Sequence, residues 1–142
     1  MPIKQISIFV ENKPGRLALI TSIIARHNID IRALSIADTT DYGILRLIVN
    51  NPDNAVSALK DEGMTVSATE VLGIAIPDVP GGFASAIRAL SDADISVEYA
   101  YAFISPEKGS AYVIIRVEDI EAASKALLGS GIKLIEQSEI FH

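Results

Sequence analysis

The sequence predicts an α+β protein built from two copies of one small unit. Residues 12–18 (NKPGRLA) recur 66 residues later as residues 78–84 (DVPGGFA), and residues 28–31 (NIDI) recur at the same offset as residues 94–97 (DISV). Short runs of alternating apolar residues, typical of strands, are followed by runs with helical spacing, and glycine or proline separates them. Because an internal repeat identifies the unit that folds, we expect two domains, at residues 1–70 and 71–142.

Each predicted unit begins with a strand and a helix that are joined by a Pro-Gly turn. The strand at residues 3–10 alternates apolar and other residues, as a half-buried strand does. Its inward residues and their counterparts in the second unit are Ile6, Ile8, Val10, Leu72, Ile74 and Ile76. After the turn the spacing becomes helical, with apolar residues at Leu17, Ile20, Ile24, Phe83, Ala86 and Leu90. We expect core-facing helices that end near residues 27–28 and 92–94.

A β-hairpin is predicted to follow the first helix of each unit. The strand pairs are residues 29–36 and 44–49, 95–104 and 111–117, with turns at residues 39–43 and 105–109. In the second unit the first hairpin strand carries an alternating apolar row of Ile95, Val97, Tyr99, Tyr101 and Phe103. An uncovered edge strand of this kind promotes aggregation, so we expect another sheet to cover it and the protein to form at least a homodimer.

A second helix and a last strand complete each predicted unit. Asn51-Pro52-Asp53 and Glu118-Asp119 are typical of helix starts, and Gly63 and Gly131 of helix ends. Weaker strands follow at residues 64–71 and 132–141. The order βαββαβ, with right-handed connections, gives a four-stranded antiparallel sheet with two helices on one face. The prediction is therefore two ferredoxin-like βαββαβ units, in which the second and fourth strands are edges.

Composition excludes several classes of function. The chain is 49% hydrophobic and 21% charged, which indicates an ordered globular protein. Its net charge of −6 and its evenly scattered lysines and arginines argue against nucleic-acid binding, and the central strands lack the stacking aromatics of RNA-recognition modules. Without a signal segment or a long apolar run, and without cysteine, we expect a cytoplasmic protein that does not contact a membrane.

The repeated Pro-Gly loops are the predicted binding sites. Each lies between a strand end and a helix start, where we expect the amides of Gly15, Arg16 and Leu17, and of Gly81, Gly82 and Phe83, to lack a partner within the chain. Free amides and the positive end of the helix dipole favour a carboxylate or a phosphate. Glycine lets such an anion approach the backbone closely.

The side chains near these loops predict an amino-acid ligand. Asn12 offers a donor and an acceptor, and Asp30 could receive an ammonium group. Asp78 and Ser96 replace them in the second unit, where Gly82 would widen the approach and Phe83, Tyr99 and Tyr101 would line a more apolar pocket. The predicted ligand-binding residues are Asn12, Lys13, Pro14, Gly15, Arg16, Leu17, Asp30, Asp78, Val79, Pro80, Gly81, Gly82, Phe83 and Ser96. In the alternative interpretation these loops are turns only, and Asn12 and Asp78 cap the helices.

Residues 11–17 (ENKPGRL), followed by residues 28–31, resemble the signature of ACT domains, the amino-acid-sensing modules of biosynthetic enzymes such as phosphoglycerate dehydrogenase and aspartate kinase. Both halves match, as in a tandem, stand-alone ACT protein. The resemblance implies binding between ACT units, with the loop of one unit facing the second strand of another. In serine-sensing members asparagines stand at the places of Asn12 and Asp30 and a histidine at Val10, so only Asn12 is carried over and serine is not the expected ligand.

We therefore expect a non-catalytic regulatory protein without cofactor or metal. It would bind a small amino acid or related carboxylate that alters assembly or contact with a regulated enzyme or regulator. A ligand-independent dimerising module is the alternative. It is suggested by Val10, which stands where serine-sensing members have a histidine, and by the apolar row on the edge strand of the second unit. An acylphosphatase-like enzyme would need an arginine in the loop together with a positioned water. Arg16 lies next to the turn, but its counterpart in the second unit is Gly82, and no paired base is evident. His27 and His142 have no cysteine beside them with which to bind a transition metal.

Overall fold

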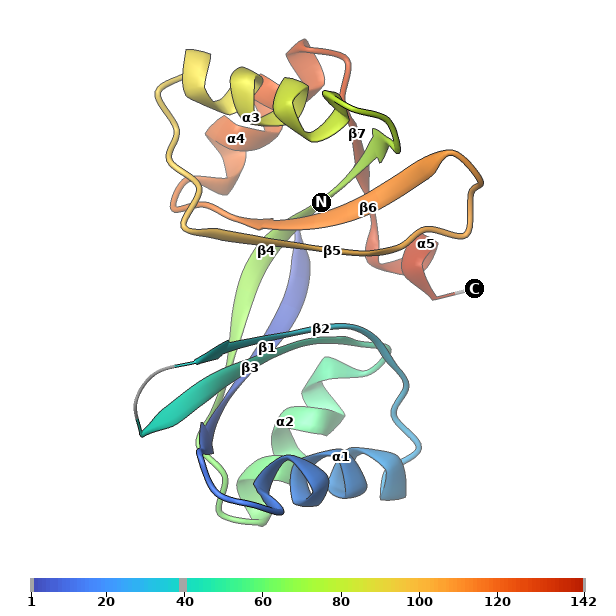
Figure 1. The fold of residues 1–142 in the computed structure, drawn as a ribbon. Coiled ribbons are helices and arrows are strands. Elements are labelled where there is room, and N and C mark those ends of the chain that lie inside the picture. Colours follow the sequence, from blue (N-terminus) through green and yellow to red (C-terminus); the bar gives the residue numbers. More distant parts are fainter. Residues whose placement is uncertain (1, 39–40, 142) are drawn as a thin grey trace. The chain divides into compact units, whose positions relative to one another are not determined.

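The computed structural model describes residues 2–38 and 41–141, which form two compact units (Figure 1). The first unit contains residues 4–69, and the second combines residues 2–3 with residues 70–141. The predicted division into folding domains at residues 1–70 and 71–142 stays a prediction. Within the described residues, no helix has the length and apolar character that crossing a membrane requires.

The first unit has the predicted order of elements. These are β1 (Ile3–Glu11), α1 (Arg16–Arg26), β2 (Ile31–Asp38), β3 (Tyr42–Val49), α2 (Pro52–Asp61) and the start of β4 (Val66–Pro77). The strand order is β2-β3-β1-β4, and β3 runs antiparallel to both of its neighbours. Buried residues from the helices and from one face of the sheet form a single core, which includes Ile6, Ile8, Ile20, Ile24, Leu47 and Leu59. This arrangement confirms the predicted ferredoxin-like unit.

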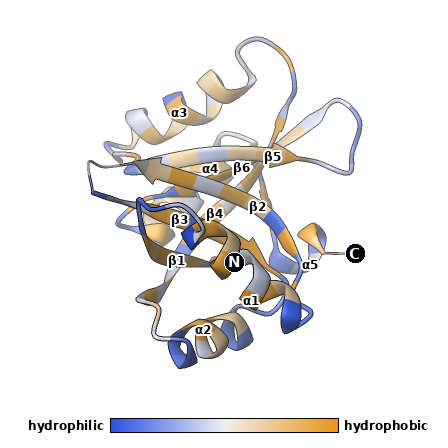
Figure 2. Cartoon of the chain, turned by 60° about the horizontal axis from the view of Figure 1, so that its bottom comes forward, coloured by the Kyte–Doolittle hydropathy of each residue, from blue (hydrophilic) through white to orange (hydrophobic). Residues whose placement is uncertain are grey.

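The second unit repeats the arrangement with a shorter last strand. It contains the rest of β4, α3 (Gly82–Asp92), β5 (Tyr99–Ile104), β6 (Ser110–Arg116), α4 (Ile120–Gly129), β7 (Lys133–Ile135) and α5 (Gln137–Ile140). The strand order is β5-β6-β4-β7, with antiparallel pairing throughout. Its core includes Leu72, Ile74, Ala86, Leu90, Ile115 and Leu127. Figure 2 shows hydrophobic residues along the strands and hydrophilic residues at the ends of α1 and α2.

The repeated Asn28 and Asp94 have a structural role at the ends of α1 and α3. Both adopt the left-handed conformation, with φ of 56° and 60°. The next residue then donates its amide back into the helix, from Ile29 to the carbonyl of Ile24 and from Ile95 to that of Leu90. Asparagine and aspartate tolerate this conformation better than most residues. This part of the repeat is thus explained by helix termination.

Two predicted strands are shorter than expected. The strand at residues 95–104 begins only at Tyr99, because Ile95 and Val97 pack against the core, and the amide of Glu98, just before the strand, donates to the carbonyl of Arg116. The strand at residues 132–141 ends at Ile135, where a capping box formed by Glu136 and Glu139 starts the short helix α5. Of the predicted turn at residues 39–43, Thr39 and Thr40 lie outside the described residues, as does His142.

The apolar row of β5 is partly covered within its own unit. Strand register places Tyr99, Tyr101 and Phe103 opposite Arg116, Ile114 and Tyr112, on the face away from the helices. Phe103 packs edge-to-face on Tyr112, with ring centroids 5.5 Å apart. The three residues of the row that lie in β5 are half-buried, whereas Ile104 on the other face is 93% exposed.

Candidate functional site

The helices α1 and α3 begin with the same tight turn. The amide of Arg16 donates to the carbonyl of Lys13 (3.3 Å), and the amide of Gly82 donates to that of Val79 (3.0 Å). Gly15 and Gly81 have φ of 85° and 86° and ψ of −12° and −8°, values of the third residue of a type II turn, where glycine is favoured. The expectation that the amides of Arg16 and Gly82 are free was therefore wrong, because the turn itself uses them.

The remaining amides of both turns are available to an external group. In the described part of the chain, no hydrogen-bond partner is found for the amides of Gly15, Leu17, Ala18, Gly81, Phe83 and Ala84. Neither helix has a side-chain cap or an acidic residue in its first turn. The interpretation of Asn12 and Asp78 as caps was wrong, since no amide of the described residues donates to either side chain.

The second helix of each unit is capped by its own chain. Asn51 accepts a hydrogen bond from the amide of Asn54 (3.3 Å), and Asp119 accepts one from the amide of Ala122 (3.0 Å). Acidic residues, Asp53 and Glu121, occupy their first turns. The helix dipole is thus compensated at α2 and α4 and left uncompensated at α1 and α3. The repeated turns thus present helix-start amides that no side chain of the described residues caps.

A hollow of about 160 Å³ lies beside the first turn, and we refer to it as the loop pocket. It is lined by Val10, Glu11, Asn12, Lys13, Leu17, Ile36 and Gly43. Asn12, Lys13 and Leu17 are predicted residues. Sequence reasoning did not predict Ile36 and Gly43, which reach the pocket through the pairing of β2 and β3.

The second unit has a matching pocket of about 260 Å³. Its lining contains no charged residue and consists of Ile76, Phe83, Ala100, Tyr101, Ala102, Ala111 and Val113. Ile76, Phe83 and Ala102 lie 66 residues after Val10, Leu17 and Ile36 of the loop pocket. Of the three aromatic residues expected in a more apolar pocket, Phe83 and Tyr101 line it and Tyr99 does not. The fold thus forms one pocket twice with different chemistry.

Two predicted residues lie away from the loop of their own unit. Asp30 precedes β2, pairs with Arg32 at 2.8 Å, and donates its amide to the side chain of Asn50 at 3.0 Å. It stands six residues before Ile36, or roughly 20 Å along an extended chain. Ser96 lines another hollow, together with Asp94 and Glu98. The resemblance implied that Asp30 and Ser96 face the loop of another unit, and this stays a prediction.

The other predicted residues of the second loop are exposed turn residues or serve packing. Asp78, Val79, Pro80 and Gly81 are exposed and do not line the matching pocket, as Pro14 and Gly15 do not line the loop pocket. Gly82 is buried, and a Cβ there would collide with the carbonyl oxygen of Pro77. The glycine is therefore needed for close backbone packing rather than for a wider approach to the site.

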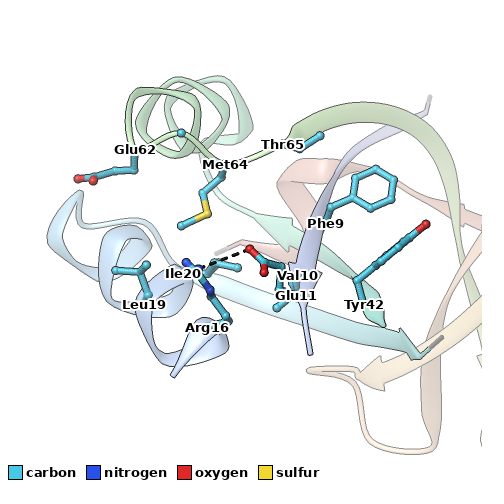
Figure 3. Close-up of a pocket in the computed structure, with 11 residues that line it drawn as sticks. Phe9, Val10, Glu11, Arg16, Leu19, Ile20, Tyr42, Glu62, Met64 and Thr65 are labelled. Atoms are coloured by element: carbon cyan, nitrogen blue, oxygen red, sulfur yellow. Dashed lines mark ion pairs between the residues drawn. The ribbon is translucent and has the colours of Figure 1, made fainter. Parts of the chain in front are cut away.

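Glu11 stands between two cations at the first turn. One carboxylate oxygen lies 3.0 Å from the Lys13 Nζ atom, and the other lies 3.4 Å from an Arg16 nitrogen. The hydrogen bond from Lys13 and then the charges of Lys13 and Arg16 hold the pKa of Glu11 below its ordinary value. Lys13 lines the loop pocket, whereas Arg16 lines a larger hollow of about 430 Å³, the side pocket (Figure 3).

Comparison with known proteins agrees with the fold and the repeat. The family model described as "ACT domain pair" matches residues 1–142. The crystal structure of protein BT0572 from Bacteroides thetaiotaomicron is 40% identical, with a TM-score of 0.93 over 99% of this chain and 96% of that one. No curated protein matches the chain.

Regulatory subunits of aspartate kinase share the fold at lower identity. The ligand-free subunit from Thermus thermophilus is 18% identical, with a TM-score of 0.67 over 89% of this chain and 91% of its own. The subunit from Thermus flavus is 17% identical, with a TM-score of 0.63 over 90% and 92%. Because the family model spans the whole chain, the protein belongs to the ACT domain pair family.

Proposed function

We propose that the protein is a non-catalytic, cytoplasmic regulatory protein that binds a small amino acid or related carboxylate at its repeated turns. Membership of the ACT domain pair family supports a regulatory, ligand-binding role. The observation that carries the proposal is the contrast between helices. The amides at the starts of α1 and α3 remain unpaired beside a pocket, whereas α2 and α4 are capped by Asn51 and Asp119.

In the first unit the ligand carboxylate binds the amides of Leu17 and Ala18. The dipole of α1 and the ammonium group of Lys13 favour the negative charge there. The Asn12 side chain hydrogen-bonds the ligand from the pocket rim, and Asp30 of another ACT unit receives the ammonium group. The small volume of the loop pocket, about 160 Å³, supports completion by a second unit, since sites for small molecules usually exceed about 300 Å³.

Ligand binding between units gives a route to regulation. A ligand that contacts two units stabilises the assembly in which both contacts form, and so shifts the equilibrium toward it. We propose a homodimer whose geometry a regulated enzyme or regulator detects. The aspartate kinase subunits that share this fold are regulatory subunits by name, which agrees with such a partner.

Calorimetric titration of the full chain with a panel of amino acids and 2-oxo acids tests this function. We expect at least one saturable ligand. Asn12→Ala should weaken it about tenfold, the effect of one lost hydrogen bond to a charged group, and Gly15→Val should weaken it further by distorting the turn. Asn54→Ala, an exposed change on α2, is the matched control. Folded protein that binds nothing in the panel would contradict the proposal.

The alternative is a ligand-independent dimerising module. Exposed apolar residues near the loop and matching pockets favour it, since Leu34 is 59%, Ile36 51% and Ile104 93% exposed. Sizing by light scattering separates the two functions. The oligomeric state of a dimerising module should be the same with and without the amino acids of the panel, whereas that of a sensor should change when its ligand is added.

A further inference from the structure

We propose that the side pocket of the first unit is a separate binding site for a free amino acid with a bulky apolar side chain. The pocket lies between the start of α1, the end of β1 and the segment that leads into β4 (Figure 3). All its lining residues belong to the first unit. Its volume of about 430 Å³ is within the range of small-molecule sites, so it needs no second unit to be complete.

The pocket combines an apolar surface with three charged residues, the ion-paired Arg16 and Glu11 and also Glu62, which pairs with Arg26 outside the pocket lining. Leu19 of α1 and Met64 face the space from two sides, and the half-exposed rings of Phe9 and Tyr42 border it, 5.7 Å apart in an edge-to-face contact. At its centre Arg16 and Glu11 are joined at 3.4 Å. An apolar pocket with a few convergent polar groups is the usual form of a ligand site.

The charge pair matches a zwitterion. The Arg16 guanidinium would bind the α-carboxylate of an amino acid, and the Glu11 carboxylate would bind its ammonium group. Both side chains are accessible, at 40% and 56% exposure. Exposed ion pairs contribute little to stability, so a ligand can replace the Arg16–Glu11 contact with little loss. The apolar side chain of the ligand would then pack against Leu19, Met64 and Phe9.

The second unit shows that the fold does not require these residues. At an offset of 66 residues, the positions of Phe9, Glu11, Arg16, Leu19 and Tyr42 hold Ala75, Pro77, Gly82, Ser85 and Lys108. The second unit nevertheless has a strand or a helix at four of these positions, with Ala75 and Pro77 in β4 and Gly82 and Ser85 in α3, whereas Lys108 lies just before β6. Exposed aromatic and apolar side chains rimmed by charges therefore need another explanation, and a bound ligand supplies it.

Methyl NMR on the full chain tests the proposal, because Met64 is one of only two methionines and its methyl group borders the pocket. L-phenylalanine and L-leucine should each shift the Met64 signal saturably. 3-Phenylpropionate lacks the ammonium group and phenethylamine lacks the carboxylate, so each should bind about tenfold more weakly. Leu19→Trp should fill the pocket and abolish the shift, whereas Ser85→Trp, the matched change in the second unit, should leave it unchanged.

Glu11→Gln is a second variant that places no bulk in the pocket, and it should weaken binding about tenfold. Folded protein without a saturable shift at about 10 mM amino acid, well above a millimolar dissociation constant, would overturn the proposal. A shift that survives Leu19→Trp but disappears in Asn12→Ala would place the amino acid in the loop pocket. That result would refute this second site and leave the proposed function intact.

Discussion

The two units share a backbone plan and differ in the chemistry around it. Each has a type II turn with a left-handed glycine, an uncapped helix start, and a pocket beside it. In the first unit Glu11, Asn12 and Lys13 border that pocket, whereas the matching pocket of the second unit has no charged residue. The comparison shows that the fold depends on the turn and the core, and that the pocket side chains vary without affecting either.

A glycine that only one unit needs provides the largest expected effect. Gly82→Ala places a Cβ against the Pro77 carbonyl and should destabilise the second unit by about 2–3 kcal/mol, as overpacking does. The matched change in the first unit, Arg16→Ala, should cost less than about 0.5 kcal/mol, because this position already holds an exposed side chain. Urea unfolding followed by circular dichroism measures both. Equal losses would show that the turns pack alike.

The contrast between capped and uncapped helices predicts the next effect. Asn51→Ala and Asp119→Ala should each cost about 1 kcal/mol, because each removes a hydrogen bond from a helix-start amide. Asn12→Ala and Asp78→Ala should change stability by less than about 0.5 kcal/mol, since neither side chain caps a helix. Thermal unfolding of the four variants tests this. A loss at Asn12 as large as that at Asn51 would restore the interpretation of the loop as a simple cap.

The left-handed residues should behave alike in both units. Asn28→Ala and Asp94→Ala should each cost about 1 kcal/mol, because alanine adopts positive φ less readily. Glycine at either position should restore the lost stability, since it takes this conformation without steric conflict. The free energy of unfolding of the four variants gives the result. Unequal values would show that the helix ends are not equivalent.

The smallest expected effects are changes of stability with pH. One occurs at low pH, at Glu11, and the other at high pH, at Lys133. The pKa of Glu11 is lowered, by Lys13 first, so its contribution to stability is present above its unfolded pKa and is lost as the pH falls through the folded value. The pKa of Lys133 is raised by Glu139 at 3.1 Å, so its contribution is present below its unfolded pKa and is lost as the pH rises through the folded value.

NMR titration of both groups measures these shifts. Lys13→Gln should move the pKa of Glu11 back toward its ordinary value, and Glu139→Gln should do the same for Lys133, each without affecting the other group. Both groups are exposed, so the effects on global stability should be small. An unchanged pKa of Glu11 in Lys13→Gln would show that Arg16 alone holds the carboxylate.

Sequence reasoning predicted much of the fold because its signals are local. The 66-residue repeat, the Pro-Gly turns and the change from alternating to helical spacing gave the order of elements, and the family model agrees with the resemblance that residues 11–17 suggested. Positive φ at Gly15 and Gly81 follows from the turn type, which adjacent residues determine. Helix starts at Asn51 and Asp119 were predicted for the same reason.

Tertiary structure decided where β5 begins and which residues meet. Strand β5 begins only at Tyr99 because Ile95 and Val97 pack against the core, whereas β7 ends where the local capping box of Glu136 and Glu139 starts α5. Strand register brings Ile36 to the loop pocket, and the side chain of Arg16 lines the side pocket instead. Neighbours in a folded chain come from distant segments whose pairing geometry the local pattern does not contain, so the sequence determined the elements and the turns, whereas packing determined the pockets.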